Sequence, residues 1–163
     1  IEKHACEPLQ KVDPKDANFY IDFEDDYFAL MTVKIKLTRL TYGIKCFKQV
    51  DGKRIKPGEN IMCITNTDFN LLNKIAIIED YECLELYISK KDYLPEDLRK
   101  VIEDQYFNKM ANPTILNKKK LNSIYGACVK KLDFNKISKK PYLTPQWGIL
   151  TASYARRNLL NVA

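Results

Sequence analysis

The periodicity of the sequence changes near residue 92, and this change limits the fold more than any other feature. Before it, apolar residues recur at every second position in segments such as VKIKL and CLELYI, the pattern of strands with one solvated face. After it, apolar residues recur at spacings of three and four, the pattern of amphipathic helices. A strand-rich half followed by a helical half predicts an α+β fold.

The first half is expected to form a mixed, β-rich subdomain. We expect strands at residues 28–37, 42–50, 61–64 and 83–88. Turns are expected at Asp51-Gly52 and at Lys56-Pro57-Gly58. The string TNTD at 65–68 predicts a helix start, because Thr and Asn side chains cap free backbone amides. The apolar face of that helix should carry Phe69, Leu72, Ile75 and Ala76.

The second half is expected to hold a helical hairpin and a closing amphipathic helix. The first helix should begin near Pro95 with two acids in its first turn, and Asn112-Pro113 should interrupt the helical pattern. Its apolar stripe should be formed by Leu98, Val101, Ile102 and Tyr106. The remaining elements are expected at 114–125, ended by Gly126, at 130–145 as a basic loop, and at 148–162. The chain thus divides into residues 1–92, 93–127 and 128–163.

Composition excludes several classes of protein. No apolar run approaches 18 residues, so the sequence predicts no membrane span. The five cysteines are widely spaced without a C-x-x-C pair, and there is one histidine, which argues against a zinc site or a disulfide framework. Buried cysteines in a reducing compartment fit better, so we expect a cytoplasmic protein.

Positive charge is concentrated at one end of the chain. Residues 117–163 hold ten basic residues and one acid, a net charge of +9, whereas residues 1–116 carry a net charge of −3. An even lysine bias on solvated faces would spread the charge, so the asymmetry favours a polyanionic partner.

Lys118, Asn122 and Tyr125 are spaced by four and three residues and should share one helix face. A lysine can bind phosphate oxygens, a tyrosine ring can stack on a base, and an asparagine can donate and accept hydrogen bonds. Gly126 would let a strand approach closely. The alternative is that Tyr125 packs in the core and the lysines are solvated, and spacing alone favours this alternative.

The string K-x-x-x-N-S-x-Y-G at 118–126 resembles the fingers motif of protein-primed family B DNA polymerases of phages and linear plasmids. The resemblance implies that Lys118 binds the triphosphate of the incoming dNTP. It implies that Asn122 and Ser123 contact nucleotide and template, and that Tyr125 lies under the nascent base pair.

A second segment, TPQWGILTASYARRNL from residue 144, resembles the segment of the same family that binds DNA at the start of the second palm section. By this resemblance the DNA-binding residues would be Gly148, Thr151, Tyr154 and Arg156 with Ser123 and Gly126, and Arg156 would contact phosphate. HACEPL, MCITNTDFNLL and ECLELYISKKDYL resemble other parts of the family in the expected order. Residues 1–92 would then be the terminal-protein-contacting region, 93–127 the fingers, and 128–163 the connector and start of the palm section.

The chain also departs from the family pattern. Ala152 stands where the family has a threonine, Thr114 replaces a further fingers lysine, and the connector at 127–143 is short. The two palm aspartate motifs that bind Mg²⁺ are not found, nor are exonuclease motifs. The acids Asp22, Glu24, Asp25 and Asp26 are interpreted as a solvated turn, and the less favoured alternative is a degenerate metal site. We therefore expect an internal segment, starting at Ile1, with no catalytic or metal-binding residue of its own and with the Mg²⁺ ligands outside it.

The leading hypothesis is a segment of a DNA polymerase that binds dNTP and DNA template-primer and is inactive alone. Its partners would be the remaining palm, thumb and exonuclease parts and a terminal priming protein. The alternatives are a stand-alone nucleic-acid-binding or adaptor module of polymerase ancestry, and a globular protein with a basic face.

Overall fold

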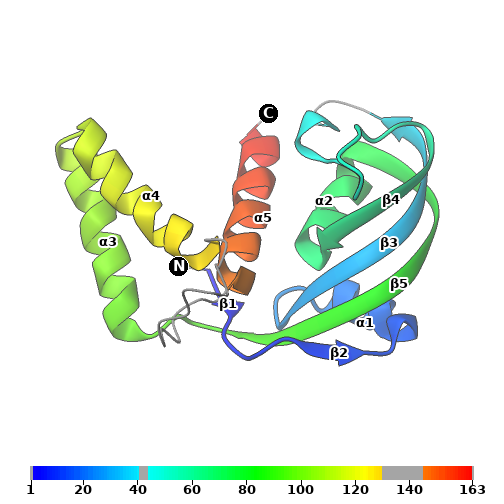
Figure 1. Cartoon of the computed structure of the whole chain (residues 1–163), viewed down its shortest axis with the longest axis horizontal. Helices are drawn as coiled ribbons and strands as arrows, with labels where there is room; N and C mark the ends of the chain where they lie inside the picture. Colours follow the sequence, from blue (N-terminus) through cyan, green and yellow to red (C-terminus); the bar gives the residue numbers. More distant parts are fainter. Residues whose placement is uncertain (1, 41–43, 130–144, 163) are drawn as a thin grey trace, which may run out of the picture.

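A curved antiparallel sheet with its covering helices forms one side of the molecule, and a helical hairpin projects from the other (Figure 1). This computed structural model describes residues 2–40, 44–129 and 145–162. The strands are β1 (His4–Ala5), β2 (Gln10–Val12), β3 (Tyr27–Leu40), β4 (Gly58–Thr65) and β5 (Ala76–Asp92). The helices are α1 (Ala17–Asp22), α2 (Asn66–Ile75), α3 (Glu96–Ala111), α4 (Ile115–Val129) and α5 (Pro145–Val162). The expected α+β class is confirmed.

The sheet has the strand order β1-β5-β3-β4, and β2 also pairs with β5. Its central strand β3 alternates as expected: Val33 and Ile35 are buried, whereas Lys34 and Lys36 between them are exposed. The 17-residue strand β5 pairs with β3 along most of its length, with three register shifts. Such irregularities bend and twist a sheet, which accounts for its curvature around α2 (Figure 1).

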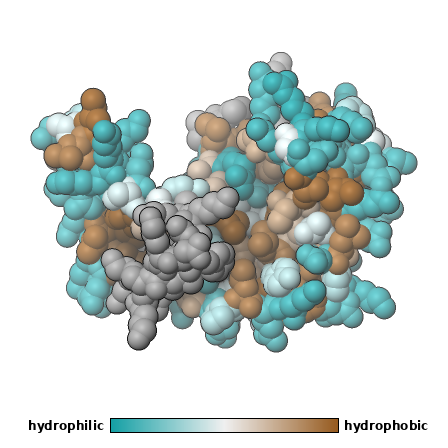
Figure 2. Space-filling model, in the orientation of Figure 1, coloured by the Kyte–Doolittle hydropathy of each residue, from teal (hydrophilic) through white to brown (hydrophobic). Residues whose placement is uncertain are grey.

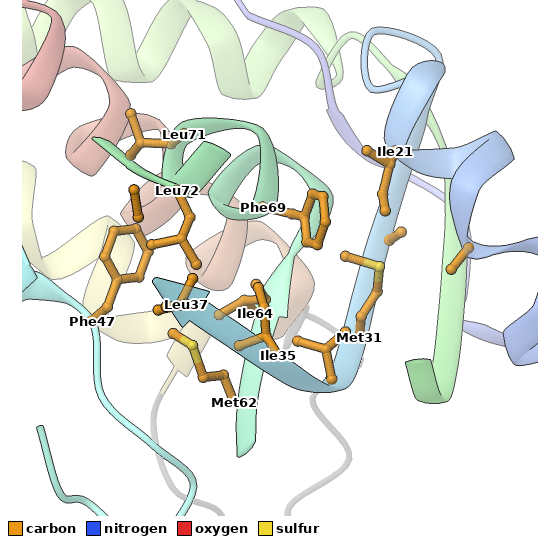
Figure 3. Packing of buried hydrophobic residues seen from close by; sticks show 14 of the residues in the cluster. Ile21, Met31, Ile35, Leu37, Phe47, Met62, Ile64, Phe69, Leu71 and Leu72 are labelled. Carbon is orange, nitrogen blue, oxygen red and sulfur yellow. The ribbon is translucent and has the colours of Figure 1, made fainter. Parts of the chain in front are cut away.

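The main core lies between the concave face of this sheet and α2. Phe69 of α2 lies on the side of Met31 of β3, and Leu72 lies over Leu37 (Figure 3). The side chain of Thr65 accepts a hydrogen bond from the amide of Asp68 at 3.1 Å, so α2 begins where the TNTD string predicts. The predicted face is confirmed for Phe69 and Leu72, but Ala76 starts β5 instead.

A smaller core fixes α5 to the edge of the sheet. It consists of Ala5, Phe28, Leu150 and Tyr154. The indole nitrogen of Trp147 also donates to the carbonyl oxygen of Ala5 at 2.8 Å. The closing helix, which starts three residues earlier than expected, therefore packs on the N-terminal strand.

One expected strand and one expected helix end are wrong. The strand expected at 42–50 is not formed in its described part: residues 44–46 make a 3-10 turn, and Lys48 makes only an isolated bridge to Arg54. Phe47 is drawn into the core by its large apolar ring, which takes the chain away from a continuous ladder. Helix α4 continues to Val129, beyond Gly126, and Gly126 does not take the positive φ of a helix-ending glycine.

The other expected turns and strands are found. Gly52 and Gly58 have φ values of 83° and 100°, which favour glycine, at the two predicted turns. The strands predicted at 61–64 and 83–88 are the inner parts of β4 and β5. The basic loop expected at 130–145, and five of its lysines, lies almost wholly outside the described residues. Within the described part, no helix combines the length and apolar character needed to cross a membrane.

Helices α3 and α4 form the predicted antiparallel hairpin on either side of Asn112-Pro113 (Figure 1). The backbone amide of Asn117 donates to the hydroxyl of Thr114 at 3.2 Å, which caps the start of α4. Helix α3 has no buried residue, and Val101 of its predicted apolar stripe is half exposed. The hairpin is therefore held mainly by its own two helices and by α5.

Candidate nucleic-acid interface

Helix α4 presents Lys118, Asn122 and Tyr125 on one exposed ridge. All three side chains are exposed, and Tyr125 keeps 43% of its surface accessible. The alternative in which Tyr125 packs in the core is therefore not what the structure shows. We call these three residues the α4 ridge.

The orientation of the α4 ridge follows from the packing of the hairpin. Among the residues of α4 whose burial the structure describes, three are half-buried, and each comes one position before a ridge residue: Asn117, Leu121 and Ile124. The side-chain amide of Asn117 donates to the carbonyl oxygen of Asn112 at 2.8 Å, which holds this stripe at the turn of the hairpin. Because consecutive helical residues are rotated by about 100°, packing this stripe leaves the ridge in solvent.

Two small residues flank the α4 ridge. The hydroxyl of Ser123 is exposed and donates to the carbonyl oxygen of Lys120 at 2.7 Å. A Cβ atom built on Gly126 would meet no other atom within 4 Å. The packing of this chain therefore does not require glycine at position 126, although glycine weakens a helix.

Charge is one-sided on the two helices that carry the candidate site. Helix α4 contains Lys118, Lys119 and Lys120, helix α5 contains Arg156 and Arg157, and neither helix contains an acid. The three lysines are exposed. A surface of this kind attracts phosphate groups.

Arg156 on α5 is held by a buried carboxylate from α2. Its Nε donates to Oδ1 of Asp68 at 2.9 Å, and its Nη2 donates to Oδ2 at 2.8 Å. This two-pronged geometry fixes the plane of a guanidinium group. The side chain of Asp68 is 3% exposed, whereas that of Arg156 is 27% exposed.

A hydroxyl network completes the connection between α2 and α5. The hydroxyl of Ser153 donates to Oδ2 of Asp68 at 3.1 Å and lies 2.9 Å from the hydroxyl of Thr65. The residue that caps α2 thus also contacts α5. Fully paired networks of buried polar groups define one arrangement of the elements they join.

The pKa of Arg156 is raised above its ordinary value. Burial opposes the charged form, but the hydrogen bonds and the charge of Asp68 outweigh it, and Cys46 and Tyr125 also favour the charged form. Helices α4 and α5 contact each other, so the hairpin that carries the α4 ridge meets the helix that carries Arg156.

The other predicted residues of α5 are divided between surface and interior. Thr151 is exposed, and its hydroxyl donates to the carbonyl oxygen of Trp147 at 2.7 Å. Gly148 is buried. Tyr154 is also buried, and its hydroxyl donates to the carbonyl oxygen of Lys3 at 2.8 Å. In this structure Gly148 and Tyr154 serve the packing of α5, and the α4 ridge does not include them.

Sequence reasoning missed Asp68. The TNTD string marks it as a residue of a helix start, but its partner Arg156 lies 88 positions away. The signal in the sequence was an acidic residue in the first turn of an otherwise apolar helix. A carboxylate buried there needs a cation or several hydrogen-bond donors.

The surface is hollowed between the hairpin and the body that carries α5, as the space-filling view shows (Figure 2). The described helices converge where α4 meets α5 (Figure 1). The predicted contacts that are exposed lie on the helices that border this hollow.

Solved structures of phi29 DNA polymerase are similar to the chain. In its ternary complex with primer-template DNA and incoming nucleotide substrates, the TM-score is 0.60 at 17% identity, over 100% of this chain and 31% of that chain. In its orthorhombic crystal form the TM-score is 0.58 at 17% identity, over 85% of this chain and 29% of that chain. In its complex with single-stranded DNA the TM-score is 0.59 at 17% identity, over 83% of this chain and 28% of that chain.

The chain thus spans less than a third of the length of the solved polymerases. It has a DNA polymerase-related fold and a distant structural relationship to phi29 DNA polymerase. No protein-family model matches the chain, and no curated protein matches it.

Proposed function

We propose that the chain is the part of a protein-primed family B DNA polymerase that binds incoming dNTP and template-primer. The observation that carries this proposal is the exposed α4 ridge, with its K-x-x-x-N-S-x-Y-G sequence, on a DNA polymerase-related fold. The solved relative in complex with primer-template DNA and nucleotide substrates supports the assignment of both ligands.

In the proposed arrangement, a nucleotide lies along the α4 ridge. The Lys118 ammonium pairs with the triphosphate, the Asn122 amide hydrogen-bonds the nucleotide, and the Tyr125 ring stacks under the nascent base pair. Ser123 and Gly126 face the template, where the missing Cβ allows a close approach. These roles fit exposed side chains and need no rearrangement of the core.

DNA phosphate is proposed to contact α5 through Arg156 and Thr151. Two nitrogens of Arg156 are engaged by Asp68, so its role is that of a fixed cation which presents its exposed edge. We leave Gly148 and Tyr154 out of the proposed contacts because both are buried.

Phosphoryl transfer in polymerases uses two metal ions. Among the residues that the structure describes, no three His, Cys, Asp or Glu side chains are placed to hold a metal ion. No step of the proposal therefore passes through a metal held by this chain. We propose that Mg²⁺, the remaining palm, thumb and exonuclease parts and a priming protein belong to a larger polymerase.

The proposal is tested by the binding of fluorescent primer-template DNA at several salt concentrations. Replacing Lys118 by alanine should reduce the slope of log affinity against log salt by about one, because one phosphate contact is lost. Lys119→Ala removes the same charge from a neighbouring face of α4 and is the matched control. Equal slopes for the two variants would contradict the assignment of Lys118.

Primer extension with Mg²⁺ separates the polymerase-segment hypothesis from a complete enzyme. The chain alone should bind template-primer and leave the primer unextended. Robust extension by these 163 residues would show that the catalytic carboxylates lie within them.

A further inference from the structure

A cavity of about 210 Å³ lies where β1, the end of β5 and α5 meet, and it shares no residue with the hairpin. Its charged lining residues are Lys3, Lys91, Arg157, Glu2 and Asp25, and the ring of Tyr154 forms one wall. We propose that this cavity binds one small tetrahedral oxyanion of the phosphate type, held by Lys91 and Arg157.

Lys91 carries the argument because the residue is largely buried, while its ammonium lines the cavity without a charged partner in the described part of the chain. Lys91 as a residue is 6% exposed, because strand β1 covers it where Ala5 pairs with Lys91. The backbone amide of Lys91 donates to the carbonyl oxygen of Asp26 at 2.8 Å. In the described part of the chain, no hydrogen bond or ion pair reaches its Nζ. The centroid of the Tyr154 ring lies 5.2 Å from Nζ of Lys91.

An isolated buried ammonium is unfavourable, and proteins normally pair it. Burial lowers the pKa of Lys91, and the charges of Glu24 and Asp25 only partly offset this effect. The ammonium of Lys91 thus faces an open cavity, and no acceptor of the described residues lies within hydrogen-bond distance of it. An anion in that space would supply the missing acceptor.

Arg157 provides a second, oriented donor. Its guanidinium carbon lies 4.6 Å from the centroid of the Tyr154 ring, and its Nη2 donates to Oε1 of Glu2 at 2.7 Å. The hydroxyl of Tyr154 donates to the carbonyl oxygen of Lys3 at 2.8 Å, which fixes the ring that both cations approach. The lining carries three positive and two negative side chains, a net charge of +1 that favours an anion.

The volume restricts the chemistry of the ligand. Sites for drug-sized molecules and cofactors measure about 300–1,000 Å³, and a water molecule takes about 30 Å³. A cavity of about 210 Å³ is too small for a nucleotide and large enough for a hydrated inorganic oxyanion. A tetrahedral anion can offer separate oxygens to Lys91 and Arg157.

The test measures thermal unfolding of the whole chain in rising inorganic phosphate, with chloride replaced at constant ionic strength and pH. A specific site predicts a saturable rise in Tm, because a ligand that binds only the folded state stabilises it. Lys91→Met keeps the linear apolar stem and should weaken phosphate binding by at least about tenfold. Lys90→Met, at the neighbouring exposed position of β5, is the control and should behave as the unchanged chain.

Amide NMR spectra of the unchanged chain provide a second measurement that needs no variant. Phosphate should shift the amide signals of Lys91, Tyr154 and Arg157 to saturation, and sulfate should reproduce the shifts. A non-saturable response, or one equal in the Lys91→Met and unchanged chains, would overturn the site. Because the hairpin is not involved, loss of DNA binding in Lys118→Ala would leave this response intact, and the two proposals can fail separately.

Discussion

Asp68 and Arg156 show how one residue pair joins two distant parts of the chain. The carboxylate is buried at the start of α2, and the guanidinium reaches it from α5 with two hydrogen bonds. The positive end of the helix also favours a carboxylate in its first turn. The position of Arg156 is therefore determined by α2 as well as by its own helix.

Removing Arg156 should destabilise the fold strongly. Arg156→Ala leaves the Asp68 carboxylate buried without its cation, and breaking a buried pair in this way costs about 3 kcal/mol. Lys34→Ala, which breaks an exposed pair with Glu59, should cost less than about 1 kcal/mol. Urea unfolding of both variants measures the difference, and equal losses of unfolding free energy would contradict the buried character of the Asp68 pair.

His4, the one histidine, predicts a pH effect on stability. Burial, followed by the charge of Lys91, lowers the pKa of His4 from 6.5, and its ring packs edge-on against Tyr154. The unfolded chain then binds a proton at a higher pH than the folded chain. The contribution of His4 to stability is complete above pH 6.5 and is lost as the pH falls below that value.

The measurement is the free energy of unfolding between neutral and mildly acidic pH for the unchanged chain and for His4→Gln. The unchanged chain should lose more stability on acidification, because the glutamine side chain of the variant does not titrate. Parallel curves would show that His4 has the same pKa in both states.

At the scale of elements, helix α4 contains a glycine, Gly126, which lowers the stability of the helix. Gly126 lies inside the helix with open space around its Cα. Gly126→Ala should stabilise helix α4 by up to about 1 kcal/mol, because alanine has the better helix propensity. The same Cβ should weaken binding of primer-template DNA if a strand passes close to the helix.

Asn108→Ala is the matched control for Gly126→Ala, because it also improves helix propensity but lies at an exposed position of α3, outside the proposed contacts. Circular dichroism melts and DNA-binding titrations of the two variants separate the effects. Unchanged DNA affinity in Gly126→Ala would argue against a close approach at this position.

Local patterns predicted the elements well where one face of an element is buried. The alternation in β3 and the cap at Thr65 depend on neighbours within a few residues, and both appear as expected. The segment 42–50 was misread because Phe47 is apolar for a reason of tertiary packing and not because it belongs to a strand. The end of α4 was misplaced because glycine can stop a helix or lie within it, and the local sequence does not distinguish the two.

One part of the candidate site could be predicted from local sequence, and the other part could not. The α4 ridge lies within eight residues of one helix, so spacing alone predicts its common face. The pairing of Arg156 with Asp68 and the burial of Tyr154 depend on contacts between residues far apart in the chain. Such contacts leave no periodic signal, so they appear only in the folded structure.

At the scale of the molecule, a well-packed body carries a hairpin that shares little of its core. The body buries Met31, Ile35 and Leu72 around the sheet. The hairpin exposes the large apolar side chains of Phe107, Met110, Ile115 and Leu116, together with half of Val101. Regions with few buried contacts open at low free energy, so the hairpin should open without unfolding the body.

Amide hydrogen exchange tests this division and the proposed function together. In the free chain, amides of β3 and β5 should exchange slowest and those of α3 and α4 fastest, because α3 has no buried residue. Saturating primer-template DNA should slow exchange along α4, from Lys118 to Tyr125, and leave β3 unchanged. Equal protection of hairpin and sheet in the free chain would show one cooperative unit. Protection by DNA that is confined to the sheet would place the nucleic-acid interface on the body and away from the α4 ridge.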